Sequence, residues 1–344
     1  MKIVVLAGGT STERTVSITS GTGICKALRQ KGHQAVLADI FCGVENVDWE
    51  NPFPQEYDVD AASAYMSGFN DRIESMKAER RSFFGPNILK LCELADIVFL
   101  GLHGANGEDG KVQAAFDLMG IKYTGTGYLS SAMAMDKGVT KAMFQMRGVP
   151  TPAGKAMKKK DRVETPQELG MDFPVVVKTC CGGSSIGVYI VDNQEDYTKA
   201  LDGAFTYENE VVVEEFVEGV EYTVAVVDGK AYPVVQIVPV QGFYDYENKY
   251  KPGAVKETCP APISEELTKR LQEAAVDGYH ALEMESYARL DFIVTKDEKI
   301  YCLEANTLPG MTPTSLIPQE AAVLGMDYPT LCEELIKVSQ KKYA

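Results

Sequence analysis

The chain has 344 residues, of which 45% are hydrophobic, and its 49 acidic and 34 basic residues give a net charge of −15. This length exceeds one typical hydrophobic core and predicts two or three domains. So acidic a surface argues against binding to nucleic acid or to an anionic membrane. Any anionic ligand must therefore be bound by locally placed Lys or Arg side chains, by backbone N–H groups or by a metal. The sequence shows no signal-peptide pattern and no run of about 18 apolar residues, so we expect no transmembrane helix.

Cysteine spacing gives no sign of disulfides or of a zinc site. The eight cysteines include no CxxC pair and no pattern of metal ligands. They are typical of reduced thiols in a cytosolic protein. We therefore expect a cytoplasmic location.

The first 124 residues are expected to form an open α/β layer. A buried strand over 2–6, a helix over 16–31 and a strand over 34–40 give a βαβ start. A strand over 96–102, a helix over 111–119 and a strand over 121–124 complete the layer, and 41–84 is expected to be an irregular insertion with one short helix. The turn AGGTSTER lacks GxGxxG spacing, which argues against an oxidoreductase with a dinucleotide site.

Two residues stand where strands of this layer end. Glu13 follows the first strand, where it could meet a ligand or interact favourably with the dipole of the next helix. His103 lies in the glycine-rich run HGANGEDG, where it could be structural or catalytic. The pattern of this layer alone leaves both alternatives open.

The middle of the chain contains a candidate phosphate-binding loop. A helical pair around 133–147 carries Asp136 and Lys137, and strands over 174–179 and 186–191 are joined by CCGGSS. The loop offers N–H and O–H groups, with Lys178 at its base, although it lacks the Gly-Lys-Ser/Thr of a Walker A loop. The alternative is a flexible hairpin tip.

The second half is expected to mix strands and helices. A helix over 194–205, a strand over 210–214 and strands over 222–227 and 231–238 lead to the polar, aromatic loop at 243–257, of a length that is usually functional. An amphipathic helix over 264–282 follows, and helices over 319–324 and 329–340 end the chain.

A predicted β-hairpin carries the clearest chemistry. Apolar runs over 290–295 and 300–305 flank the polar turn 296–299. A turn centred between Asp297 and Glu298 would pair the two strands so that alternate positions share one face.

The residues on that face are polar. Asp291 would lie opposite Glu304, and Arg289 opposite Asn306. The two carboxylates would repel each other, and a hard cation would relieve that repulsion. Oxygen ligands without His or Cys indicate magnesium, held also by substrate phosphates. The alternative is a solvated strand face with an Arg–Asp pair.

Taken together, these segments resemble the D-alanine–D-alanine ligase family of the ATP-grasp superfamily. The resemblance covers nearly the whole chain except about 41–89. It rests on seven motifs in order: 8–16, LHGANGEDG at 102–110, MDK at 135–137, GGSSIG at 182–187, FYDYENKY at 243–250, RLDF at 289–292 and LEANTLPGMT at 303–312.

The resemblance implies an α/β fold, α+β in its C-terminal half. A Rossmann-like N-terminal domain over 1–124 would precede a central ATP-grasp subdomain over 125–213 and a C-terminal ATP-grasp subdomain over 214–344 that carries the metal and substrate site. It also implies a homodimer.

The resemblance assigns the nucleotide site. Asp291, Glu304 and Asn306 would hold two magnesium ions, for which manganese could substitute. Lysines would contact the phosphates of ATP, and a strand end and its neighbours would bind the nucleoside. The implied residues are Lys137 and Lys178 for the α- and β-phosphates, Lys249 for the γ-phosphate, Glu214 for the adenine amino group, the backbone of Glu215, Phe216 and Val217 for the adenine edge, Glu221 for the ribose, and Phe243.

The resemblance also assigns the amino-acid site. Glu13, Ser184 and Tyr250 match a hydrogen-bonded triad in which Glu13 meets the ammonium of the first D-alanine, which favours the ligand reading of Glu13. The remaining implied residues are His103 beside the same substrate, Ser315 and Leu316 for the second D-alanine, and Arg289 with the Gly310 N–H for the oxyanion.

The implied activity is ATP-dependent ligation of two D-alanine molecules through an acyl phosphate, for peptidoglycan synthesis. D-Serine or D-lactate as the second substrate is an alternative, because pockets reject one added hydroxyl poorly. A non-catalytic nucleotide-binding regulator on the same fold is an alternative of a different class.

Overall fold

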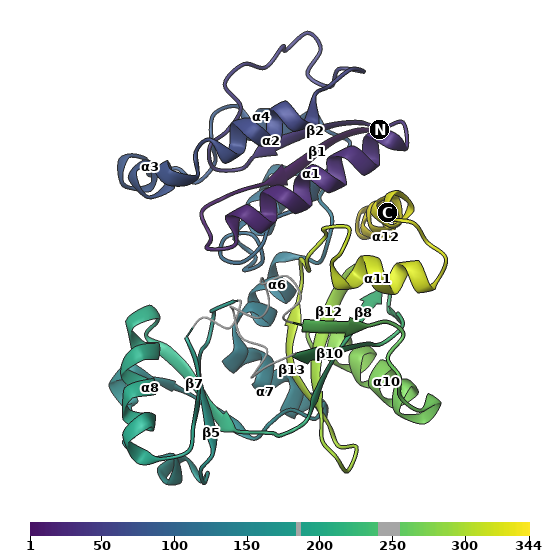
Figure 1. The fold of residues 1–344 in the computed structure, drawn as a ribbon. Coiled ribbons are helices and arrows are strands. Elements are labelled where there is room, and N and C mark those ends of the chain that lie inside the picture. The colour runs from purple at the N-terminus through teal and green to yellow at the C-terminus, as the bar shows by residue number, and fades with distance from the viewer. Residues whose placement is uncertain (184–186, 240–254) are drawn as a thin grey trace.

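The computed structural model describes residues 1–183, 187–239 and 255–344 (Figure 1). Its strands form a three-stranded, a four-stranded and a six-stranded sheet. In Figure 1 the three-stranded sheet lies at the top, the four-stranded sheet at the lower left and the six-stranded sheet at the lower right. No helix within the described ranges is long and apolar enough to cross a membrane.

The N-terminal sheet is parallel and buried on both faces. Its strands have the order β2-β1-β3, with bounds β1 (Lys2–Ala7), β2 (Gln34–Asp39) and β3 (Ile97–Leu100). Ile3 and Val5 pack with α1 (Arg14–Gln30) on one face, whereas Val4 and Leu6 pack with α4 (Ile88–Glu93) and α5 (Lys111–Met119) on the other. Burial on both faces explains why β1 reads as a continuous apolar run.

Two expectations for this region are wrong. The insertion over 41–84 holds two short α-helices rather than one, α2 (Val59–Ser67) and α3 (Ile73–Glu79). Helices of seven and nine residues span too few turns to show a clear period, although each buries apolar side chains, Val59 and Met66 in α2 and Ile73 in α3. The strand expected over 121–124 is reduced to a single bridge between Val98 and Tyr123.

The four-stranded sheet is antiparallel and follows two helices. These helices are α6 (Tyr128–Met135) and α7 (Lys137–Arg147), and the Asp136 side chain caps α7 by accepting from Gly138 N and Val139 N. The sheet has the order β4-β7-β5-β6, and α8 covers one of its faces. The bounds are β4 (Gly154–Lys158), β5 (Val175–Thr179), β6 (Val188–Val191), α8 (Gln194–Tyr207) and β7 (Glu210–Glu215).

The six-stranded sheet carries the hairpin. Its order is β11-β10-β8-β12-β13, with β9 beside β8. Gly278 lets α10 approach β12 closely, since a Cβ there would lie 2.4 Å from Leu290 Cδ2. The bounds are β8 (Val220–Val227), β9 (Lys230–Ala231), β10 (Val235–Pro239), β11 (Val255–Thr258), α10 (Glu265–Ala281), β12 (Tyr287–Val294), β13 (Ile300–Asn306), α11 (Leu316–Val323) and α12 (Tyr328–Gln340).

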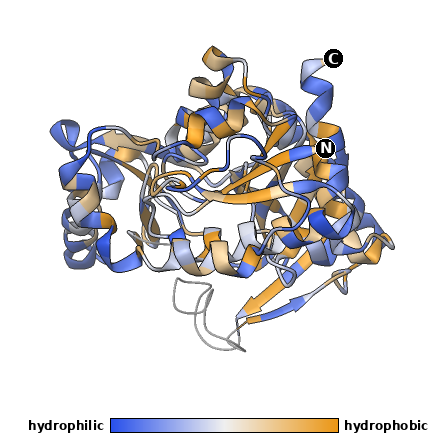
Figure 2. Cartoon of the chain, turned by 90° about the horizontal axis from the view of Figure 1, so that it is seen from above, coloured by the Kyte–Doolittle hydropathy of each residue, from blue (hydrophilic) through white to orange (hydrophobic). Residues whose placement is uncertain are grey.

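The two faces of this sheet have different partners. Val224 and Val226 of β8 pack with α10, whereas Ala225 and Val227 pack with α11, α12 and the N-terminal layer. Figure 2 shows hydrophobic colour along the inner strands and hydrophilic colour on outer helices. The C-terminal helix therefore lies beside the start of the chain, as Figure 1 also shows.

The strand expected over 231–238 is interrupted. β9 ends at Ala231 and β10 begins at Val235, and Pro233 between them has no N–H for a ladder bond. The Glu320 carboxylate fills the gap by accepting from Ala225 N at 2.8 Å. Pro233 thus explains the interruption locally, and Glu320, distant in sequence, satisfies the backbone N–H that the interruption leaves in β8.

Candidate active site

A cavity of about 960 Å³ is lined by residues of the four-stranded and six-stranded sheets, by α1 and by the loops that follow β1 and β3 of the three-stranded sheet. It is lined by every predicted site residue that lies within the described ranges. These are Glu13, His103, Lys137, Lys178, Glu214, Glu215, Phe216, Val217, Glu221, Arg289, Asp291, Glu304, Asn306, Gly310, Ser315 and Leu316. Ser184, Phe243, Lys249 and Tyr250 lie outside the described residues, so their predicted roles stay predictions.

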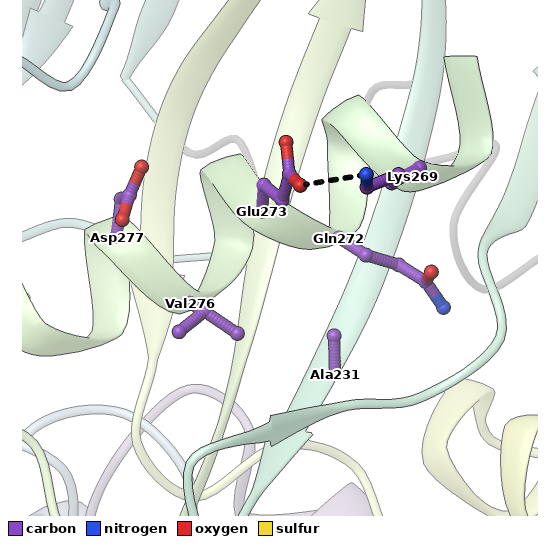
Figure 3. Close-up of a pocket in the computed structure, with 6 residues that line it drawn as sticks. All are labelled: Ala231, Lys269, Gln272, Glu273, Val276 and Asp277. Carbon is purple, nitrogen blue, oxygen red and sulfur yellow. Dashed lines mark ion pairs between the residues drawn. The ribbon is translucent and has the colours of Figure 1, made fainter. Parts of the chain in front are cut away.

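A second, more open hollow of about 370 Å³ lies against α10 (Figure 3). It is lined by Ala231, Lys269, Gln272, Glu273, Val276 and Asp277. Lys269 and Glu273 form an ion pair of 3.7 Å across one helical turn. None of the predicted site residues lines this hollow, so the larger cavity is the candidate active site.

The hairpin pairs its polar residues as predicted. Asp291 lies opposite Glu304, and Arg289 lies opposite Asn306. The turn differs, because Thr295 N bonds to Lys299 O at 3.0 Å and the loop is centred on Asp297 rather than beyond it. A three-residue loop whose last residue, Glu298, has a φ of +57° produces this geometry.

A β-bulge reconciles the shifted turn with the predicted pairs. Phe292 lies opposite Cys302, whereas Asp291 lies opposite Glu304, so Leu303 is the extra residue. The bulge places Leu303 and Glu304 on the cavity side together, while Cys302 is buried in the core. Two consecutive side chains can therefore serve the same cavity.

Positive side chains neutralise the two carboxylates of the hairpin. Arg289 donates to both oxygens of Asp291, with Nε–Oδ1 at 2.9 Å and a second contact at 2.7 Å, and Thr223 Oγ1 donates to Oδ1 at 2.6 Å. Lys137 Nζ lies 3.4 Å from Glu304 Oε2. The repulsion expected between the carboxylates is thus balanced by cations of the chain itself.

The donor set of the hairpin fits a hard cation. Asn306 donates from its amide nitrogen to Asp291 Oδ2 at 3.0 Å, so its amide oxygen is the atom suited to a cation. Among the described residues no three His, Cys, Asp or Glu side chains gather as a metal cage. Two carboxylates and one amide form instead the sparse oxygen set that magnesium uses when substrate phosphates complete its shell.

A buried carboxylate lies between two lysines on the other side of the cavity. Glu214 Oε1 lies 2.5 Å from Lys178 Nζ, and its Oε2 lies 2.7 Å from Lys141 Nζ. Burial alone would raise the pKa of Glu214, but Lys178 and Lys141 together hold that pKa below its ordinary value. Glu214 is therefore a charged acceptor.

In the segment after Glu214, one backbone N–H group is placed to donate a hydrogen bond to a ligand. Glu215 N donates to Ala153 O at 2.8 Å, and Phe216 N donates to Pro174 O at 3.2 Å. These two donors are used within the chain. Among the described residues the Val217 N–H meets no acceptor, and Val217 lines the cavity.

Glu13 lies between two glycine-containing loops. It precedes α1 but makes no capping hydrogen bond with its side chain. A Cβ on Gly104 would lie 2.9 Å from Glu13 Oε2, and a Cβ on Gly183 would lie 3.2 Å from the same oxygen. Both loops therefore approach this carboxylate closely, and Gly104 also has a φ of +68°, which favours glycine.

His103 is a buried link between elements of the cavity wall. Its Nδ1 lies 3.0 Å from Leu308 O, and its Nε2 lies 3.0 Å from Ser20 Oγ. A carbonyl oxygen can only accept, so Nδ1 carries the proton and Nε2 accepts from the serine. Burial lowers the pKa of His103, which keeps the ring neutral.

The loop before α11 brings Gly310 beside Ser315. A Cβ on Gly310 would lie 3.0 Å from Ser315 Oγ. Ser315 Oγ also accepts from Thr312 N at 3.0 Å, and Ser315 directly precedes α11. The loop thus presents backbone N–H groups and a helix N-terminus to the cavity, an arrangement that suits an anion.

Comparison with known proteins assigns the chain to a family. Family models for the N-terminus and the C-terminus of D-ala D-ala ligases match residues 2–126 and 143–337. The chain is 42% identical to the D-alanine–D-alanine ligase of Pediococcus pentosaceus over 351 aligned positions, which cover 100% of this chain and 99% of the relative. The chain belongs to the D-alanine–D-alanine ligase family.

Solved structures of ligases from this family have the same fold. The Bacillus anthracis D-alanine–D-alanine ligase complexed with ATP superposes with a TM-score of 0.75 at 28% identity, over 99% of this chain and 97% of that chain. The VanG D-Ala:D-Ser ligase of Enterococcus faecalis superposes with a TM-score of 0.77 at 27% identity, over 98% and 99%. The predicted α/β ATP-grasp fold is confirmed.

Sequence reasoning missed several residues at this ligase cavity. Glu108 joins two loops, because its Oε2 accepts from Gly104 N at 2.7 Å and its Oε1 accepts from Leu308 N at 3.1 Å. Burial, assisted by the charge of Glu13, raises the pKa of Glu108 to about 8. The sequence feature that could have indicated Glu108 is its position in the run HGANGEDG, which begins with His103. Leu303 also lines the cavity, and Lys141 and Thr223 support its lining residues Glu214 and Asp291.

Proposed function

We propose that this chain joins two molecules of D-alanine into D-alanyl-D-alanine, with ATP converted to ADP and phosphate, to supply peptidoglycan synthesis. The observation that carries this proposal is the convergence of the predicted residues on one cavity. Carboxylates, lysines and close-approach glycines from three parts of the chain meet there. Membership of the D-alanine–D-alanine ligase family supports the same activity.

The hairpin is the proposed metal site of this reaction. Asp291, Glu304 and Asn306 would hold magnesium, which neutralises phosphate charge and orients the transferring group. On the opposite wall, Glu214 would accept from the adenine amino group, and the Val217 N–H would donate to the purine edge. Apolar lining such as Leu303 would contact the purine faces.

In the first step Glu13 holds the ammonium of the first D-alanine. The carboxylate of that substrate attacks the γ-phosphorus of ATP, so a carboxyl O–P bond forms while the bond to the β-phosphate oxygen breaks and ADP leaves. Lys137 and Lys178 place positive charge beside the phosphates, which favours the charge distribution of the transition state. The product is an acyl phosphate that water must not reach.

In the second step the amine of the second D-alanine attacks the acyl carbon. A C–N bond forms, the amine loses a proton and phosphate leaves. Arg289 and the Gly310 N–H hold the oxyanion, and Ser315 with Leu316 holds the second substrate. Arg289 also donates to Asp291 through Nε and Nη2, which would hold the guanidinium in place.

A panel of acceptors tests the proposal. ADP release is measured with D-alanine alone and with D-alanine mixed with D-serine or D-lactate, and products are identified by mass. We expect D-alanyl-D-alanine as the main product. A mixed dipeptide or depsipeptide as the main product would instead assign a D-alanine–D-serine or D-alanine–D-lactate ligase. ATP binding without D-alanine-stimulated ADP release would contradict ligase activity and indicate a regulator.

We also propose that the protein is a cytoplasmic homodimer. All eight cysteines are free, in keeping with a reducing compartment. Leu118, which is 91% exposed, and Met119 on α5 are accompanied by exposed Tyr128 and Leu129 at the start of α6, which packs against α5. Such apolar surface suits a protein contact. Sedimentation of the native chain and of Leu118→Asp tests this, and a monomeric native chain would contradict it.

A further inference from the structure

Lys141 is a buried lysine to which the predicted site gives no role. It follows Lys137 by four residues on α7, so both lie on one side of that helix. Lys141 and Glu214 are 5% and 4% exposed. Among the described residues, Lys178 and Glu214 line the cavity, whereas Lys141 does not. Lys141 therefore lies behind the Glu214 carboxylate.

The ammonium of Lys141 is fixed by three acceptors. Its Nζ lies 2.7 Å from Glu214 Oε2, 2.6 Å from Pro152 O and 3.2 Å from Thr151 Oγ1. An ammonium has three N–H donors, so each has a partner. Lys178 reaches the other oxygen of Glu214 from the cavity wall. Lys178 can therefore contact a ligand in the cavity, whereas Lys141 is held in place beside Glu214.

We propose that Lys141 is a positioning residue that keeps Glu214 charged and aimed at the amino group of adenine, and so selects ATP over purine nucleotides that lack this group. This inference rests on the proposed function, in which Glu214 reads the amino group and Lys178 contacts phosphate. When Lys178 turns to a phosphate, Glu214 loses one cation. The second cation, held by the backbone and by Thr151, stays in place.

The charges around Glu214 show why the second cation matters. The groups that face it are Lys178 from β5 and Lys141 from α7, with Glu215 next in β7. A buried carboxylate without a cation takes up a proton, because burial penalises its charged form. A protonated Glu214 would turn a donor toward the amino group. Lys141 prevents that outcome while Lys178 is engaged elsewhere.

A nucleotide comparison tests the proposal. D-Alanine-dependent ligation is measured with ATP and with purine riboside triphosphate, which lacks the 6-amino group, for the native enzyme and for Lys141→Met. We expect the native enzyme to favour ATP by about tenfold or more in kcat/KM, as for a hydrogen bond to a charged group. In Lys141→Met we expect kcat/KM for ATP to fall by about tenfold because KM for ATP rises. The kcat/KM for the analogue is expected to stay unchanged.

Two further variants separate positioning from structure. Lys141→Arg keeps the charge and is expected to restore most of the preference. Lys155→Met, an exposed position on β4 opposite Val213, is the matched control and is expected to keep native values. Lys141→Gln, which keeps a donor for Pro152 O but not the charge, replaces Lys141→Met should that variant fail to fold. Its KM for ATP is expected to rise as pH falls from 8 to 6, whereas the native KM stays flat.

The outcomes distinguish this inference from the proposed function. Equal losses for ATP and for the analogue in Lys141→Met, or no loss for either, would overturn the role of Lys141 while the ligase assignment stands. A native ligase that uses both nucleotides equally would overturn the role of Glu214 and with it this inference. Absence of ligation by the native enzyme would overturn the proposed function.

Discussion

Asp291 lies directly opposite Glu304 across β12 and β13, although the turn that joins these strands is displaced from its predicted centre. The extra residue Leu303 compensates for the displacement just before the pair is reached. The pair thus depends on a bulge and not only on the alternation of the strands.

Removing one charge of this pair is expected to stop the reaction. Asp291→Asn and Glu304→Gln should each lower kcat for D-alanine-dependent phosphate release by about a hundredfold or more, because metal binding supplies several kcal/mol of transition-state stabilisation. Asp297→Asn, in the exposed turn of the same hairpin, should keep native turnover. Native kcat in either site variant at saturating magnesium would exclude the hairpin as the metal site.

The bulged residue is expected to serve the nucleotide. Leu303→Ala removes apolar surface from the cavity wall and should raise KM for ATP about five- to tenfold with little change in kcat, as expected when about 1–1.5 kcal/mol of apolar contact is lost in binding. Val323→Ala, at an exposed position on α11, is the control. An unchanged KM for ATP in Leu303→Ala would mean that the purine lies elsewhere.

Glu108 is expected to make folding stability depend on pH. Its pKa is raised to about 8 in the folded chain, so the folded state holds this proton more tightly than the unfolded state. This contribution is fully present below the ordinary pKa near 4.5 and is lost as pH rises to about 8.

The measurement is urea unfolding of the native chain and of Glu108→Gln at a series of pH values. The free energy of unfolding should fall less steeply with pH in the variant between about 5 and 8. Glu265→Gln, in the exposed first turn of α10, should keep the native slope. Equal slopes for the native chain and Glu108→Gln would show that Glu108 titrates normally.

The end of the chain is expected to stabilise the N-terminal layer. Tyr343 Oη accepts from Tyr123 N at 2.9 Å and donates to Tyr123 O at 3.1 Å. Tyr343→Phe should lower the free energy of unfolding by about 1–2 kcal/mol, because both backbone groups lose their partner. Tyr207→Phe, at an exposed position, should change it by less than about 0.5 kcal/mol. Similar effects of both variants would argue against this contact.

The sequence predicted secondary structure best where a short segment shows a clear hydrophobic pattern or a capping residue. The apolar run of β1, the alternation in β12 and the caps of α7 and α10 are visible without tertiary information. The predicted pairing of Asp291 with Glu304 assumed strict alternation and a turn centred beyond Asp297. The structure has neither, and the bulge at Leu303 restores the same pair. These local patterns fix where the strands and helices lie, whereas the roles of the site residues stay predictions.

Features that depend on distant partners were missed. The contacts of Lys141 with Glu214, and of Glu108 with Leu308, join segments far apart in the chain, and no local period indicates them. The bulge at Leu303 has no composition signal, and the insertion helices are too short to show one. The domain boundaries at 124 and 213 stay predictions, since one hydrophobic core joins β1 and α1 to α12.

Transfer of oxygen tests the central claim most directly. D-Alanine labelled with ¹⁸O in its carboxylate is supplied with ATP and magnesium, and the released phosphate is analysed by mass. Attack of the carboxylate on phosphorus, followed by expulsion of phosphate by the second amine, predicts one ¹⁸O in each phosphate and an equal amount of D-alanyl-D-alanine. Unlabelled phosphate, or ADP formed without dipeptide, would contradict the acyl phosphate route.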